Sequence, residues 1–138
     1  MIKKILFAYD GSEQAEKAFD FALDIASKYQ TSVEVLSVAI PPEPAAMVET
    51  EAVLENATEY YEKHFAVFRN RAESAGISIK FEVRIGHAAE QIIRKAYEDE
   101  IDMIVMGHRG KSFIQRWRLG SVCKRVLSYA HCTVSVVR

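Results

Sequence analysis

The chain has 138 residues, of which 49% are hydrophobic and 27% charged, a composition typical of one globular domain spanning residues 1–138. No apolar run approaches the roughly 20 residues that cross a bilayer, and the first residues lack a signal-peptide cleavage pattern, so we expect no membrane partner and a cytoplasmic location. Two cysteines are present, Cys123 and Cys132, without zinc-site spacing, and we expect buried free thiols rather than a disulfide.

The net charge of −1 conceals a strong asymmetry along the chain. Residues 1–102 hold 11 Lys or Arg and 19 Asp or Glu, whereas residues 103–138 hold 7 Lys or Arg and no acid. A carboxyl-terminal segment this basic suits an anionic ligand, and a merely solvated basic surface is the alternative.

The order of apolar segments predicts a regular alternation of strands and helices. Strands are expected at 2–9, 32–40, 77–85, 103–106 and 132–137, and helices from the 10–12 turn to 28 and at 48–74, 87–99 and 120–129. In the second helix, Leu54, Tyr61 and Phe68 are among the apolar residues predicted to lie on one side. The proline cluster 41–44 is the one obvious flexible segment.

Strict alternation of this kind predicts an α/β fold, a three-layer α/β/α sandwich around a five-stranded parallel sheet. In such doubly wound, Rossmann-like sheets, ligands bind beyond the carboxyl ends of the strands, where the winding reverses. Asp10, Val38 and Gly107 lie at or near the ends of the first, second and fourth strands, so we expect all three at one edge.

A glycine-rich loop, GHRGKSFIQRWRLGS, runs from Gly107 to Ser121 between the fourth strand and the fourth helix. Glycines allow backbone N–H groups to approach an anion, and a helix amino terminus adds unpaired donors and a positive dipole end. The glycine spacing matches neither a Walker A loop nor a dinucleotide fingerprint. The loop is therefore predicted to be a nucleotide phosphate site of another type.

Gly107, Gly110, Gly120 and Ser121 instead fit the spacing G-x2-G-x9-G-[ST]. With the beginning KKILFAYDGSEQAEKAFDFALDIA and the end LGSVCKRVLSYAHCTVSVVR, this pattern resembles the universal stress protein (UspA) family, in its ATP-binding subclass, over essentially the whole chain. The family has an adenine nucleotide alpha hydrolase-like fold. The resemblance implies binding of ATP or another adenine nucleotide, with Mg²⁺ or Mn²⁺ held through the phosphates.

The same resemblance assigns roles to individual residues. Asp10 and the backbone around Val38 would meet adenine and ribose, and Gly107 would lie under the ribose. The phosphates would be cradled by Gly110, Gly120, Ser121 and Val122. Family members often have a small residue where this chain has His108-Arg109, and Arg109 could add a phosphate contact. The family also implies a homodimer through the last strand, 133–137, in agreement with the tendency of an exposed apolar edge strand to pair.

Simpler interpretations of some of these residues remain open. Asp10 could be a helix N-cap, with Glu13 completing a capping box, and Ser121 could be the N-cap of the fourth helix. His64 and His131 belong to no recognisable constellation of functional residues.

The sequence favours a nucleotide-dependent sensor of stress over a metabolic enzyme. Hydrolysis needs a residue that orients water, and no acid occurs from Met103 onward, so any ATPase activity should be slow. The alternatives are a slow ATPase and an interaction module, in which the basic loop around Trp117 docks an acidic partner. Sequence-specific binding to nucleic acid is not expected.

Overall fold

The computed structural model describes residues 1–41, 47–108 and 119–138. Every strand and helix expected from the sequence is present, with ends that differ by at most three residues. The strands are β1 (Lys4–Ala8), β2 (Ser32–Ala39), β3 (Ile79–Ile85), β4 (Met103–Gly107) and β5 (Thr133–Val137), and the helices are α1 (Glu13–Tyr29), α2 (Met47–Ser74), α3 (Ala88–Glu98) and α4 (Ser121–Tyr129).

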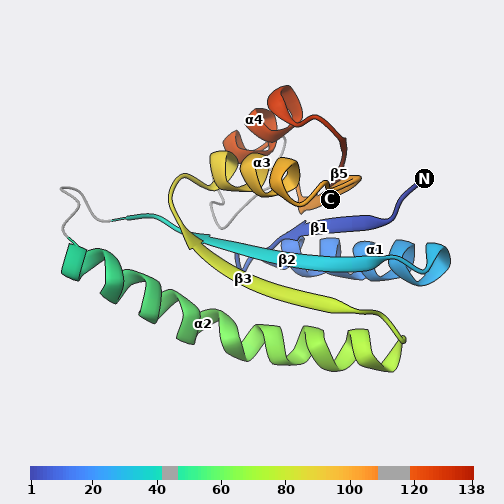
Figure 1. Ribbon diagram of the computed structural model, residues 1–138, viewed down its shortest axis with the longest axis horizontal. Coiled ribbons are helices and arrows are strands. Elements are labelled where there is room, and N and C mark those ends of the chain that lie inside the picture. Colours follow the sequence, from blue (N-terminus) through green and yellow to red (C-terminus); the bar gives the residue numbers. More distant parts are fainter. Residues whose placement is uncertain (42–46, 109–118) are drawn as a thin grey trace.

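The strands form one parallel sheet in the order β3-β2-β1-β4-β5. The chain moves outward from β1 through β2 to β3 and then returns to the other side of β1 as β4 and β5, so the winding reverses between β1 and β4. Helices α1 and α2 cover one face of the sheet and α3 and α4 the other (Figure 1). The predicted three-layer α/β/α sandwich is confirmed.

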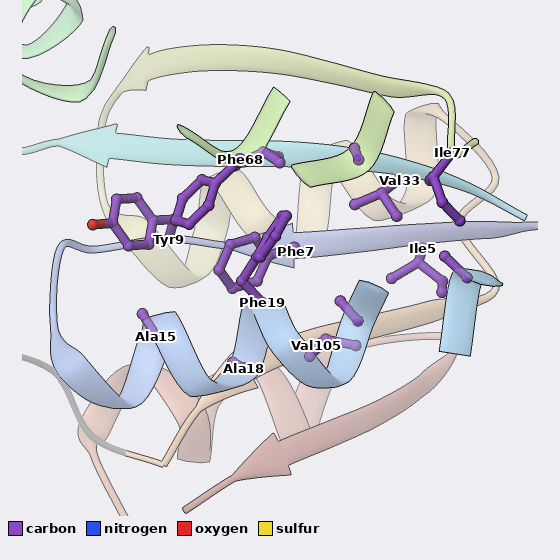
Figure 2. Packing of buried hydrophobic residues seen from close by; sticks show 14 of the residues in the cluster. Ile5, Phe7, Tyr9, Ala15, Ala18, Phe19, Val33, Phe68, Ile77 and Val105 are labelled. Atoms are coloured by element: carbon purple, nitrogen blue, oxygen red, sulfur yellow. The ribbon is translucent and has the colours of Figure 1, made fainter. Parts of the chain in front are cut away.

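The larger core lies between the sheet and the pair α1 and α2 (Figure 2). Alternation along β1 points Ile5 and Phe7 toward this face, and helical spacing brings Phe19 of α1 and Phe68 of α2 onto them. The Phe19 and Phe68 rings stack with centroids 4.2 Å apart, and Phe7 contacts both. These aromatic rings join the two helices to the central strand.

A second core lies under α3 and α4, where Leu6 and Ile104 of neighbouring strands meet Ile92 and Val126. Both cysteines are free, as predicted. Cys123 is buried in this core, whereas Cys132 is half-buried beside it, so the predicted burial is wrong for Cys132.

The apolar side predicted for α2 is not buried along its whole length, since the Leu54 side chain is 38% exposed. The buried residues of α2 are Tyr61, Phe65, Phe68 and Ala72, all in the second half of the helix. Figure 1 shows that the first turns of α2 extend past the carboxyl end of β3, where they have no sheet to cover.

Candidate functional site

The chain leaves β1 through a turn that directs Asp10 away from the sheet at its carboxyl edge. The Tyr9 N–H donates to the carbonyl of Leu36 at 2.9 Å, and the buried Ser37 hydroxyl donates to the carbonyl of Tyr9 at 2.7 Å. Two hydrogen bonds to β2 thus fix the residue just before Asp10. The Asp10 side chain itself is exposed.

Asp10 then closes the turn that starts α1. Its Oδ1 accepts the Ser12 N–H at 2.9 Å, and Gly11 has a φ of 85°, in the region that favours glycine. The N-cap of α1 is Ser12, whose hydroxyl accepts the Ala15 N–H at 3.1 Å. The alternative in which Asp10 is the N-cap, with Glu13 in a capping box, is wrong. Because the helix is capped by Ser12, one carboxylate oxygen of Asp10 is not committed to the turn bond.

The charge of Asp10 acts on groups in both helical layers. The pKa of the Tyr61 hydroxyl on α2 is raised by burial and then by the Asp10 charge. Burial and the same charge raise the pKa of the Cys123 thiol on α4 to about 11. The charge at position 10 is therefore felt in both helical layers at this edge of the sheet.

Gly107, the last residue of β4, lies directly against the start of α1. A Cβ added there would be 2.9 Å from the backbone nitrogen of Ala15 and 2.9 Å from the carbonyl carbon of Gln14, closer than real Cβ contacts. The Gly107 carbonyl accepts the Cys123 thiol at 2.9 Å. The glycine thus has a packing reason, which is separate from the predicted position under a ribose.

His108 joins three segments through its backbone. Its N–H donates to the carbonyl of Val137 at the end of β5, at 2.7 Å, and its carbonyl accepts the Gly120 N–H at 3.2 Å. The first bond extends the β4–β5 pairing by one residue. The second brings the beginning and the end of the glycine loop together, so that α4 starts beside the carboxyl end of β4.

Helix α4 begins without a side-chain cap. Its N-cap is Gly120, with φ −62° and ψ 155°, and the first turn contains no acidic residue. Ser121 is the first helical residue and is exposed, so the alternative in which Ser121 is the N-cap is wrong. Val122 is half-buried against the α3 and α4 core. The first N–H groups of α4 therefore have no side-chain oxygen at the N-cap to satisfy them.

The structure brings five of the predicted residues to the region where the winding reverses: Asp10, Gly107, Gly120, Ser121 and Val122. Val38 lies one strand further along the same edge, half-buried and paired with Arg84 of β3. Arg109 and Gly110 lie outside the described residues, as does Trp117.

Two groups near Asp10 were missed by the sequence interpretation. The Tyr9 hydroxyl and His64 Nδ1 are 3.0 Å apart, which joins the end of β1 to α2 and gives His64 a structural partner that the sequence did not indicate. Ser37 was the other omission. Neither residue stands in a motif, and the partners in these bonds are 55 and 28 residues apart, so local patterns carried no signal for them.

Within residues 1–41, 47–108 and 119–138, no three His, Cys, Asp or Glu side chains gather in a way that could hold a metal ion. None of the helices in these ranges has the length and apolar character needed to span a membrane.

These features define a doubly wound α/β protein whose candidate ligand site lies at the reversal of winding, between β1, β4 and the uncapped start of α4. A family model for the universal stress protein family matches residues 1–138. A universal stress protein of Methanocaldococcus jannaschii is 32% identical over 145 residues, covering 100% of this chain and 83% of the relative. The chain belongs to the universal stress protein family.

Solved structures agree with this assignment. The universal stress protein UspA from Lactobacillus plantarum has a TM-score of 0.81 at 26% identity, covering 99% of this chain and 97% of that one. A universal stress protein solved in complex with cAMP has a TM-score of 0.75 at 24% identity, with 99% and 97% covered. Another, from Archaeoglobus fulgidus in complex with dAMP, has a TM-score of 0.65 at 19% identity, with 100% and 98% covered. The two nucleotide-bound structures, at 24% and 19% identity, show likeness of fold alone.

Proposed function

We propose that this universal stress protein binds an adenine nucleotide, ATP in its working form, and acts as a nucleotide-dependent sensor in the response to stress. The nucleotide lies across the reversal of winding. Asp10 and the backbone near Val38 contact the adenosine, and the phosphates extend over Gly107 toward Gly120, Ser121 and Val122. Arg109 and Gly110, which lie outside the described residues, belong to the phosphate side of this proposal.

The observation that carries the proposal is the amino terminus of α4. It is nine residues long, has glycine as its N-cap, lacks a side-chain cap and has no acid in its first turn. Such a helix end offers backbone N–H donors and the positive end of the helix dipole to an anion. The hydrogen bond from Gly120 to His108 holds this helix end against β4.

The adenosine side is supported by the position of Asp10 and by the two nucleotide-bound relatives. The exposed Asp10 carboxylate uses Oδ1 in the turn bond, and among the described residues its other oxygen is open to accept from a ribose hydroxyl. The relatives solved with cAMP and with dAMP share this fold and bind adenine nucleotides.

A divalent cation fits this site only through the phosphates. The described residues offer no cluster of three acidic, His or Cys groups, and Asp10 is a single carboxylate. Mg²⁺ and Mn²⁺ commonly bind one or two protein groups at most and complete their coordination with phosphate oxygens and water. Asp10, on the adenosine side, is poorly placed to orient an attacking water. We therefore expect nucleotide hydrolysis to be slow and the presence of bound nucleotide to be the signal.

We further propose a homodimer in which β5, paired only with β4 in the described sheet, is the contact strand.

Thermal unfolding with two ligands tests the nucleotide proposal. A ligand at 100 times its dissociation constant adds about 2.7 kcal/mol of stability, which raises the Tm of a domain of this size by about 8–13 °C. Millimolar ATP with Mg²⁺ should produce such a shift, and tripolyphosphate, which lacks adenosine, a smaller one. The Asp10→Asn variant should lose part of the ATP shift and keep the tripolyphosphate shift. The absence of any ATP shift contradicts nucleotide binding, and equal shifts from both ligands contradict the adenosine site.

A further inference from the structure

A buried ammonium group on α3 lies among three carboxyl groups, on the side of the sheet away from α1 and α2. Lys95 is 94% buried. Its Nζ is 2.8 Å from Glu82 Oε1 on β3, 2.8 Å from Asp99 Oδ2 at the end of α3 and 3.4 Å from Glu34 Oε2 on β2. One positive charge thus faces three groups that are ordinarily negative.

The other charges around this cluster compensate some of the carboxyl groups and not others. Arg84 of β3 forms ion pairs with Glu82 and with Glu98. Lys4 of β1 donates to the backbone carbonyl of Asp99 at 3.1 Å, and Lys80 of β3 lines the same cavity of about 360 Å³. Lys80 is the register partner of Glu34, but within the described residues neither Lys4 nor Lys80 forms an ion pair with Glu34, the third carboxyl group around Lys95.

Glu34 is therefore the least compensated group of the cluster. Its side chain is 13% exposed. Its Oε2 is buried and, although 3.4 Å from Lys95 Nζ, has no hydrogen-bond partner in the part of the chain that the structure describes. A buried carboxylate without hydrogen bonds is strongly disfavoured, and taking up a proton removes the charge.

Asp99 provides an acceptor for that proton. Glu34 Oε2 and Asp99 Oδ2 both lie against Lys95 Nζ, at 3.4 Å and 2.8 Å, so the two carboxyl groups are neighbours. Two carboxyl groups can form a hydrogen bond only when one of them is protonated. Burial, followed by the bond to Asp99, raises the pKa of Glu34, whereas the bonds to Lys95 and Glu34 lower the pKa of Asp99. The proton therefore resides on Glu34, and Asp99 is the ionised acceptor.

We infer that Glu34 and Asp99 form a proton-dependent latch between the sheet and the carboxyl-terminal end of α3. Asp99 is the C-cap of α3, with its N–H bonded to the Lys95 carbonyl at 2.9 Å, and Glu34 is in the middle of β2. In the protonated state the bond joins helix to strand. Loss of the proton leaves two adjacent carboxylates beside an ammonium already bonded to Glu82, and the end of α3 loosens. The latch is independent of any nucleotide.

The direction of the pH effect follows from the raised pKa of Glu34. The folded protein holds this proton above about pH 4.3, where an unfolded glutamate has lost it. The stability that this proton contributes is fully present below the pKa of Glu34 in the unfolded chain and is lost as the pH rises through its pKa in the folded protein. Between these two pKa values, each rise of one pH unit lowers the folding equilibrium constant of wild type by up to tenfold. The comparison is with a variant that has a permanently neutral group at position 34.

Urea unfolding of wild type, Glu34→Gln and Glu82→Gln between pH 5 and 9 tests this inference. Glu34→Gln should match wild type at pH 5 and become progressively more stable than wild type as the pH rises. Glu82→Gln removes a carboxylate from the same ammonium and is the matched control; it should be less stable than wild type throughout. A Glu34→Gln variant that is destabilised in parallel with Glu82→Gln overturns the latch, because Glu34 then acts as an ordinary ion-pair partner.

A direct measurement covers the case in which Glu34→Gln fails to fold. The carboxyl carbon of Glu34 in wild type, followed by NMR, should titrate above the ordinary range of glutamate. Hydrogen exchange of the last turn of α3 should accelerate over the same pH interval, after correction for the intrinsic pH dependence of exchange. Titration of Glu34 at or below the ordinary value contradicts the inference.

Discussion

Replacing Gly107 by alanine tests whether this glycine is required by packing, apart from any ligand. The new Cβ would be 2.9 Å from both the nitrogen of Ala15 and the carbonyl carbon of Gln14, whereas ordinary contacts are 3.4–4 Å. Both opposing atoms belong to the backbone of α1, so no side-chain rotation can relieve the contact. Either α1 or the end of β4 must move by about half an ångström.

The structure sets the size of the effect. Inserting a methyl group into a close-packed contact costs about 1–3 kcal/mol, and a backbone neighbour favours the upper part of that range. Gly76→Ala is the control, because its Cβ would have no neighbour within 4 Å, although its φ of 70° still strains an alanine. We expect Gly76→Ala to cost about 1 kcal/mol through the backbone conformation alone.

The assay is urea unfolding of nucleotide-free protein, together with hydrogen exchange at the start of α1. Gly107→Ala should lower the free energy of unfolding by about 2–3 kcal/mol and reduce protection of the first turns of α1. Gly76→Ala should leave protection there unchanged. If Gly107→Ala unfolds with the wild-type free energy, the close approach of β4 to α1 does not constrain this position, and the packing argument fails.

Two further predictions concern buried groups at the carboxyl edge. Ser37→Ala removes a donor from the buried Tyr9 carbonyl and should lower the free energy of unfolding in urea by about 1–3 kcal/mol. The control, Ser128→Ala, removes an exposed hydroxyl bond to the Lys124 carbonyl and should change this free energy little. Equal losses in the two variants contradict the idea that the Ser37 bond holds the end of β1 to β2. The Cys123 thiol, with its pKa raised to about 11 by burial and by Asp10, should be alkylated by iodoacetamide far more slowly at pH 8.5 in the folded protein than in urea, as followed by mass spectrometry. Equal rates in the folded and unfolded protein would show that this thiol is accessible and ionised.

The fold was predictable because apolar periodicity and turn residues act locally. The alternation of strands and helices predicted all nine elements of the described residues, with ends that differ by at most three residues. Leu54 shows where periodicity stops being informative. The helical pattern continues into the first turns of α2, but the sheet that would cover them ends, and only tertiary structure determines that end.

The candidate site was predictable only in part. The rule that ligands bind where the winding reverses, with the glycine spacing, brought Asp10 and Gly107 to the same edge from sequence alone. The sequence does not decide which residue caps α1, because Asp and Ser are both good N-caps. The turn at Gly11, with its positive φ, makes Ser12 the cap, and that turn is seen only in the structure. The contact of Tyr9 with His64 depends on how α2 packs over β1, which local sequence does not specify.

The contact between Gly107 and α1 also determines the dimensions of the site. The same backbone approach that excludes a Cβ at Gly107 places the start of α1, and therefore the Asp10 turn, beside the end of β4. The thiol of Cys123 bonds to the Gly107 carbonyl, so the beginning of α4 is held to that same point. The separation between Asp10 and the α4 amino terminus is thus set by core packing around one glycine. A larger residue at position 107 should therefore alter the fit of a nucleotide even where it touches no ligand atom.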